Sequence, residues 1–173
     1  MNDESPVTRE DWLKHAMMEH EHLLMRYAQH FVSDLDRARD VVQDTFFKLC
    51  RHDQTHERLH GKHLTKWLYR VCRNQAIDVA RKEKRMTLAP SEQFDRQSDV
   101  TAANPDATAL AAERQQSLMA RIQDLSANQQ EVLRLKFHGE LSYEQIADVT
   151  GLSKTNVGYL LHTAISKLRR QIT

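Results

Sequence analysis

The sequence has few of the residues that form turns, disulfides and paired-cysteine sites. Among its 173 residues are only four glycines, three prolines and two cysteines. So few turn-forming residues argue against a protein made of many short strands. Cys50 and Cys72 form no CxxC pair, so we expect two free thiols.

Long apolar runs and common enzyme motifs are also missing. No apolar stretch approaches membrane-spanning length, and the first twelve residues contain no basic or apolar signal segment. We therefore expect a cytoplasmic protein in a reducing compartment. The sequence has no Gly-rich phosphate loop and no nucleophile elbow. It thus predicts no enzymatic activity, no catalytic residues and no cofactor.

Apolar residues recur instead at spacings of three and four, which predicts an all-α protein. We expect helices at Arg9–Phe31, Leu35–Arg51 and Leu64–Arg85, and helical periodicity resumes near Ala107. Between them, residues 86–106 contain two prolines and many small polar residues, a composition typical of a flexible linker. The prediction is two small helical domains, residues 9–85 and 107–173, joined by that linker.

The near-neutral total charge conceals strong sorting along the chain. Residues 64–85 carry seven cations against two acids, and residues 153–173 carry four cations and no acid. Residues 87–113, in contrast, carry five acids against one arginine. The pattern indicates two basic units on an acidic tether, and nucleic acid is a natural partner for such units.

Residues 141–172 have the spacing of a helix-turn-helix. Ser142 with Gln145 forms a capping-box pattern, Gly151 is placed to end that helix, and Ser153 is placed to start the next. A helix-turn-helix lays its second helix in the DNA major groove. The candidate DNA-reading residues are Ser153, Lys154, Thr155, Asn156, Tyr159 and His162. The alternative is a plain helical hairpin with a solvated basic end.

Two other helices carry charged stripes of opposite sign. The stripe on the helix at 64–85 suits a phosphate backbone and consists of Lys66, Arg70, Arg73, Asn74, Arg81 and Lys84. Trp67 or Tyr69 could stack on an unpaired base, although a core position is favoured for Trp67. The helix at 35–51 has an acidic stripe that suits a basic protein partner: Asp36, Asp40 and Asp44, with Gln43 and Phe47 beside it. A solubilising acidic face is the alternative.

Several of these segments together resemble one family. RARDVVQDTFFKLCRH and LTKWLYRVCRNQAIDVARKEKR resemble region 2 of the extracytoplasmic-function (ECF) sigma factors, group IV of the sigma-70 family of bacterial RNA polymerase. SANQQEVLRLKFHGELSYEQIADVTGLSKTNVGYLLHTAISKLRR is similar to their region 4. The family's reading helix often has basic residues where this chain has Gly158, Leu160, Thr163 and Ile165, so minus-35 contacts are expected at the residues named above.

The resemblance implies a role for each segment. Asp40, Gln43, Asp44 and Phe47 would bind the clamp helices of the largest polymerase subunit. The loop at His52–His63 and the basic helix after it would capture and melt the minus-10 element. Region 4 would read the minus-35 element and contact the flap of the second-largest subunit, and the acidic linker would run toward the RNA exit path. The resemblance leaves open whether an anti-sigma factor restrains the protein.

Two other hypotheses are kept beside this one. A two-domain helix-turn-helix regulator would bind duplex DNA without core polymerase. The ten histidines also suggest a metal site, foremost around Cys50, His52, His56, His60 and His63. We expect no physiological metal there, because no second set of supporting residues accompanies these ligands.

Overall fold

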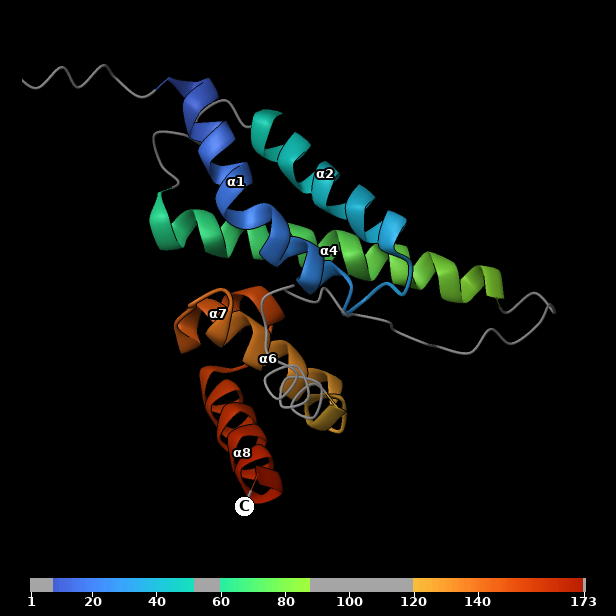
Figure 1. Cartoon of the computed structure of the whole chain (residues 1–173), viewed down its shortest axis with the longest axis vertical. Helices are drawn as coiled ribbons and strands as arrows, with labels where there is room; N and C mark the ends of the chain where they lie inside the picture. The colour runs from blue at the N-terminus through green and yellow to red at the C-terminus, as the bar shows by residue number, and fades with distance from the viewer. Residues whose placement is uncertain (1–7, 52–59, 88–119, 173) are drawn as a thin grey trace, which may run out of the picture.

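The computed structural model describes residues 8–51, 60–87 and 120–172, and these residues confirm the all-α prediction. No strand occurs among them. In chain order the helices are α1 (Arg9–Ala28), α2 (Leu35–Arg51), α4 (Gly61–Thr87), α6 (Ala127–Phe137), α7 (Tyr143–Thr150) and α8 (Lys154–Ile172). Figure 1 shows α1, α2 and α4 as one group, and α6, α7 and α8 as a second group beside α4.

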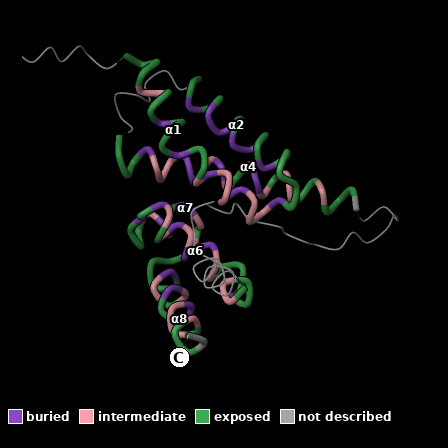
Figure 2. The backbone as a smooth tube through the Cα atoms, in the orientation of Figure 1, coloured by how far each residue is buried: buried purple, intermediate pink, exposed green. Residues whose placement is uncertain are grey.

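The first three helices form an amino-terminal unit in which each helix contacts the other two. Its core is built from one apolar face of each helix, as Figure 2 shows by the buried segments where they meet. The largest buried side chains include Leu24 and Tyr27 of α1, Val41 and Leu49 of α2, and Leu68 of α4. Burying each of the aliphatic side chains contributes about 1.5–3 kcal/mol, so this core holds the charged stripes of α2 and α4 in place.

Where helix ends differ from the predicted ones, they differ by two or three residues, and α4 continues to Thr87, two residues beyond the predicted Arg85. α2 has the predicted bounds, and its start is capped by Asp34, whose carboxylate accepts a hydrogen bond from the Asp36 amide at 2.8 Å. α1 ends three residues before the predicted Phe31, because a tight turn follows in which the Phe31 amide bonds to the Ala28 carbonyl. α4 begins at Gly61, with φ of +49°, three residues before the predicted start.

The last three helices form a carboxy-terminal unit that confirms the predicted helix-turn-helix. Both predicted capping boxes are present, Ser126 with Gln129 at the start of α6 and Ser142 with Gln145 at the start of α7. Gly151 ends α7 in the left-handed conformation, with φ of +77°. Fully buried aliphatic side chains from all three helices, Val132, Leu135, Ile146, Val157 and Leu161, form the core of this unit.

The two units pack against each other. α4 contacts α7, and the side chain of Tyr27 in α1 contacts α6. Leu141, in the turn between α6 and α7, is fully buried. A Cβ atom added to the neighbouring Gly139 would lie 3.0 Å from the Tyr69 ring and 2.9 Å from the Leu135 carbonyl oxygen. The absent side chain therefore lets this turn approach the amino-terminal unit closely.

Candidate nucleic-acid and protein-binding surfaces

The predicted acidic stripe lies on the outer face of α2. Its five residues, Asp36, Asp40, Gln43, Asp44 and Phe47, are all exposed. They lie there because Val41, Val42 and Phe46 turn the opposite face of α2 into the core. Phe47 is 61% exposed, which is unusual for a side chain of this size and apolarity.

The charges around Phe47 are largely uncompensated. Asp36 pairs with Arg39 at 2.9 Å on the same face. Within the described residues, neither Asp40 nor Asp44 forms an ion pair. An exposed aromatic ring beside unpaired carboxylates suits a protein partner that offers an apolar pocket rimmed by cations.

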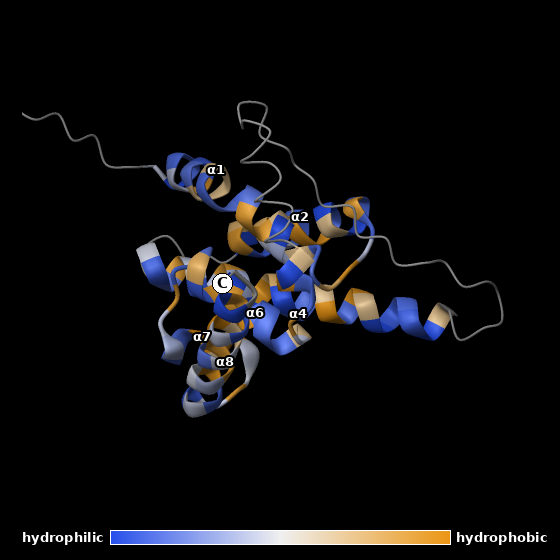
Figure 3. Cartoon of the chain, turned by 60° about the horizontal axis from the view of Figure 1, so that its bottom comes forward, coloured by the Kyte–Doolittle hydropathy of each residue, from blue (hydrophilic) through white to orange (hydrophobic). Residues whose placement is uncertain are grey.

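The predicted basic stripe lies along α4, but its residues do not share one environment. Arg70, Asn74, Arg81 and Lys84 are exposed. Figure 3 shows a run of hydrophilic residues along the free end of α4, where the last two of these lie. Lys66 and Arg73 are only partly exposed and face the carboxy-terminal unit.

Two carboxylates of the carboxy-terminal unit engage these two cations. Lys66 pairs with Asp148 of α7 at 3.1 Å. Arg73 donates from Nε to Glu131 of α6 at 2.6 Å, and a second nitrogen lies 3.5 Å from the other carboxylate oxygen. The Tyr27 hydroxyl donates to the same Glu131 carboxylate at 2.8 Å. Glu131 was absent from the predicted site, although it lies four residues before the buried Leu135, in line with the apolar face of α6.

Burial shapes the protonation of this cluster. Burial, together with the charge of Glu131, raises the pKa of Tyr27 well above its usual value, so the hydroxyl keeps its proton and remains a donor. Burial acts to lower the pKa of Arg73, but the hydrogen bond and the charge of Glu131 raise it overall. At neutral pH Arg73 therefore stays charged and Tyr27 stays a neutral donor, and both donate to the Glu131 carboxylate.

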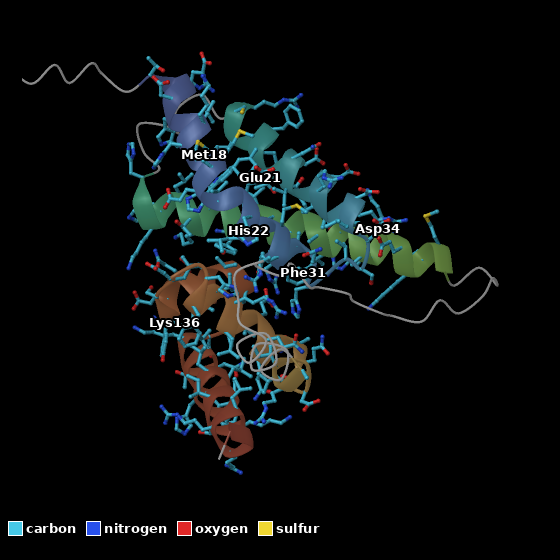
Figure 4. The ribbon with its side chains drawn as sticks, in the orientation of Figure 1. Met18, Glu21, His22, Phe31, Asp34 and Lys136 are labelled. Atoms are coloured by element: carbon cyan, nitrogen blue, oxygen red, sulfur yellow. The ribbon has the colours of Figure 1, made fainter. Side chains whose placement is uncertain are left out.

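A cleft of about 840 Å³ runs between the two units beside this cluster. Its lining is rich in cations and histidines, including Arg26, His30, Arg134 and His138, and Figure 4 shows Phe31 at the end of α1 on this side. Burial and the charge of Arg134 lower the pKa of His30 to about 4. Burial and the charges of Arg26, Arg134 and His22 also lower the pKa of His138. Both imidazoles are therefore neutral at neutral pH.

The prediction that Tyr69 stacks on a base is wrong. Tyr69 is only 1% exposed, and its ring packs edge to face on that of Tyr27 at a centroid distance of 4.9 Å. It lies on the same helical face as Cys72 and Ala76, both fully buried, and that spacing could have identified it as a core residue. Trp67 is partly buried against the core, the position favoured for it above.

The predicted DNA-reading residues lie together at the start of α8. Ser153, Lys154, Thr155, Asn156, Tyr159 and His162 are all exposed. Ser153 caps the helix by accepting a hydrogen bond from the Asn156 amide at 3.2 Å, and Lys154 pairs with Glu144 of α7. Gly158 faces Tyr143, whose ring carbons would lie 3.6 Å or more from an added Cβ atom.

Some predictions fall on residues outside the described ranges. These are most of the minus-10 loop, including His52 and His56, and most of the 86–106 linker. The described part of the loop segment differs from the prediction, because Gly61, Lys62 and His63 belong to α4. Within the described residues no group of three or more His, Cys, Asp or Glu side chains could hold a metal ion, and no helix could span a membrane. Both cysteines are free, Cys50 exposed and Cys72 buried.

Comparison with known families gives two matches in the order of the two units. The family described as Sigma-70 region 2 matches residues 16–86, and Sigma-70, region 4 matches residues 115–168. The ECF RNA polymerase sigma factor SigL of Mycobacterium tuberculosis is 30% identical over 87% of this chain and 83% of its own length. The RNA polymerase sigma factor YlaC of Bacillus subtilis is 27% identical over 87% of this chain and 86% of its own.

A solved structure shares the fold. The sigma factor RpoE of Bartonella quintana, in complex with the anti-sigma factor NepR, superposes with a TM-score of 0.71 at 23% identity. The superposition covers 94% of this chain and 97% of the other. At this level of identity the likeness establishes the fold, and the sequence matches over both units carry the assignment to a family.

Proposed function

The chain belongs to the ECF sigma factors of the sigma-70 family. From that membership we propose which partner binds each of its three surfaces, on α2, α4 and α8. A protein of this family functions as an RNA polymerase sigma factor, with core RNA polymerase and promoter DNA as partners. The proposal concerns which residues of this chain meet each partner.

The proposed domains follow the sequence boundaries. Residues 9–85 act as region 2, residues 107–173 act as region 4, and residues 86–106 link them. The family matches at 16–86 and 115–168 support these assignments. We further propose that the chain works in the cytoplasm and leaves RNA synthesis to the polymerase, with no catalytic residue of its own.

The acidic face of α2 is the proposed core-polymerase surface. The observation that carries this assignment is the exposure of Phe47 beside two carboxylates, Asp40 and Asp44, that have no ion-pair partner among the described residues. Binding through Asp40 and Asp44 breaks no ion pair among the described residues, so these two carboxylates lose little when a cationic partner approaches. Asp36 and Gln43 extend the same face.

The two DNA surfaces are proposed on α4 and α8. The cations of α4 with Asn74 would hold the minus-10 strand through its phosphates. The first two turns of α8 would enter the major groove at the minus-35 element, where Asn156 and Lys154 can reach base edges. The capped, exposed start of α8 supports this placement. An anti-sigma factor is a further candidate partner, since RpoE of Bartonella quintana was solved in complex with one.

The decisive experiment tests core binding and transcription together. Purified protein is mixed with bacterial core polymerase, and co-migration and transcription from a pool of genomic promoters are measured. Replacing both Asp40 and Asp44 with Lys reverses two charges on the proposed face. We expect core affinity to fall about a hundredfold or more, since like-charge contacts cost several kcal/mol.

The matched control reverses two exposed carboxylates of the same unit, Glu10 and Glu21 of α1, to Lys. It makes the same change in net charge on α1 instead of α2 and should leave core affinity near that of the unmodified protein. Equal affinities for the Asp40 and Asp44 variant and the control would remove the docking assignment. A folded protein that drives no transcription in the presence of core would favour the polymerase-independent regulator.

A further inference from the structure

We propose that the cleft between the two units is a binding site for an oligophosphate chain, the group that nucleoside di- and triphosphates carry. Two arginines bind the chain, Arg26 of α1 and Arg134 of α6, and both line the cleft. Neither belongs to the surfaces proposed above for polymerase or DNA. The site goes beyond the proposed function, because it adds a small-molecule ligand to a protein whose other partners are macromolecules.

The two arginines approach each other from different units. Both side chains are partly buried. Burial and the charge of Arg26 lower the pKa of Arg134, and smaller effects of Tyr27 and Glu131 oppose this. Arg134 still stays charged, because a guanidinium is not deprotonated in proteins. The fold therefore holds two cations close enough to repel each other in a partly buried place.

No carboxylate offsets this repulsion. Within the described ranges neither Arg26 nor Arg134 forms an ion pair. The two carboxylates that line the cleft are bound to other cations, Glu131 to Arg73 and Glu83 to Arg37. Arginine binds phosphate oxygens through two parallel hydrogen bonds, as it binds carboxylates. A phosphate chain that bridges the two guanidinium groups would therefore replace their repulsion with two attractive contacts.

Neutral hydrogen-bonding groups lie around the two arginines. The imidazoles of His30 and His138 line the cleft, and so do the side-chain amides of Gln29, Asn128 and Gln130. Burial raises the pKa of Tyr69, against the opposing charge of Arg26, so the Tyr69 hydroxyl keeps its proton. This buried hydroxyl has no hydrogen-bond partner in the part of the chain that the structure describes. A ligand rich in acceptor oxygens suits a place with so many donors.

The size and the apolar lining of the cleft favour a nucleotide over an inorganic chain. The volume of about 840 Å³ lies in the range of sites for small organic molecules. Phe31, Ile77 and Ile122 line the cleft and are partly exposed, and Figure 4 shows Phe31 at the end of α1. An accessible aromatic ring can stack on a nucleobase. The cleft thus offers cations to the phosphates and apolar surface to the base.

Isothermal titration calorimetry on the full chain without polymerase tests the site. The probes are ATP, GTP, inorganic tripolyphosphate and adenosine, at ~0.15 M salt to screen weak surface contacts. The probes that carry phosphates should bind, and adenosine should not. Binding of ATP or GTP about tenfold tighter than tripolyphosphate identifies a nucleotide as the source of the chain. Equal or tighter binding of tripolyphosphate identifies an inorganic chain as that source.

Two substitutions each remove one of the bridged cations. Arg26→Gln and Arg134→Gln should weaken binding of the tightest probe about tenfold or more, because a hydrogen bond to a charged group is lost. Arg51→Gln is the matched control, at an exposed position at the end of α2 outside the cleft. Arg70→Gln is a second control, an exposed cation of α4 that does not line the cleft. Both controls should bind the probe like the unmodified protein.

Thermal unfolding separates a binding role from a structural one. Without ligand, Arg134→Gln should unfold at the same temperature as the unmodified protein or at a higher one, because the substitution removes the repulsion from Arg26. Saturating probe should raise the Tm of the unmodified protein and of both controls, since a ligand that binds only the folded state stabilises it. The same probe concentration should raise the Tm of the two cleft variants much less.

Three results would overturn the proposal. The first is that no phosphate-bearing probe binds the folded protein at ~1 mM. The second is an equal loss of affinity in the cleft variants and the two controls, because the loss then comes from net charge alone. The third is a lower Tm of the cleft variants with unchanged affinity for the probe, which gives the two arginines a structural role.

Discussion

Acidification should weaken the folded protein through His30, at the junction of the two units. The ring is partly buried and faces Arg134 and Glu131 of α6, and it is hydrogen-bonded to the backbone of Ala127. Arg26 of α1 lines the same cleft. Burial and the charge of Arg134 outweigh the opposing effect of Glu131, so the pKa of His30 falls to about 4. Protonating this imidazole places a third cation among arginines.

The sign and size of this destabilisation follow from the difference between the pKa values of His30 in the unfolded and folded chain. The unfolded chain takes up a proton at a pKa of about 6.5, and the folded chain does so only at about 4. The stability that depends on neutral His30 is therefore present above pH ~6.5 and is lost as the pH falls through the folded value. A group with these two values would destabilise the fold by about 1.4 kcal/mol at pH ~5.5. Because the ring is partly accessible to water, we expect a net effect of about 1 kcal/mol.

Urea unfolding at pH ~7.5 and ~5.5 measures this effect. Other groups also titrate over this range, so the informative quantity is the difference between the unmodified protein and His30→Asn. The unmodified protein should lose about 1 kcal/mol more on acidification, a difference of about 0.5 M in the urea midpoint. His15→Asn, at an exposed position on α1, serves as control and should behave like the unmodified protein. Equal acid sensitivity of the unmodified protein and His30→Asn would refute the reasoning.

Three further predictions concern the carboxy-terminal unit. Ser142→Ala removes the side-chain half of a capping box and should lower the free energy of unfolding by about 1 kcal/mol in a denaturant titration, with an unchanged midpoint counting against the cap. Leu161→Ala, at a position 1% exposed, should lower it by about 2–5 kcal/mol, and a loss below 1 kcal/mol would mean the core is loosely packed there. Asn156→Ala should change the base preference at the minus-35 element in a promoter-library selection with core polymerase, whereas an identical preference profile would exclude Asn156 as a base reader.

The structural features that could be predicted from the sequence are those that depend on residues close together in the chain. The bounds of α2, both capping boxes and the left-handed Gly151 depend on residues within one or two turns of each other, and all are found in the structure. The exposure of the α2 and α8 candidates also follows, because apolar residues at three-and-four spacing fix which face of a helix is buried. Their roles in binding stay predictions.

The packing between the units was not predictable in this way. Glu131 meets Arg73 and Tyr27 across separations of 58 and 104 residues along the chain, with a linker between them. A pattern of neighbouring residues in the sequence cannot predict a contact between residues so far apart in the chain. Arg73 was predicted to bind DNA because it belongs to a row of cations on one helix. The sequence of that row does not show which arginine pairs with a carboxylate and which is exposed to solvent. The structure therefore adds the pairing of Glu131 with Arg73 and Tyr27.

The two cysteines offer a practical consequence of the packing of α2 and α4. Burial raises the pKa of Cys72 to about 12, so this thiol is both covered and protonated at neutral pH. Cys50 is exposed and lies one turn beyond Phe47 on α2. A maleimide fluorophore should therefore attach at Cys50 alone in the folded protein. A change in its emission would then measure the binding of a partner to the proposed polymerase-binding face, and no labelling site would have to be engineered.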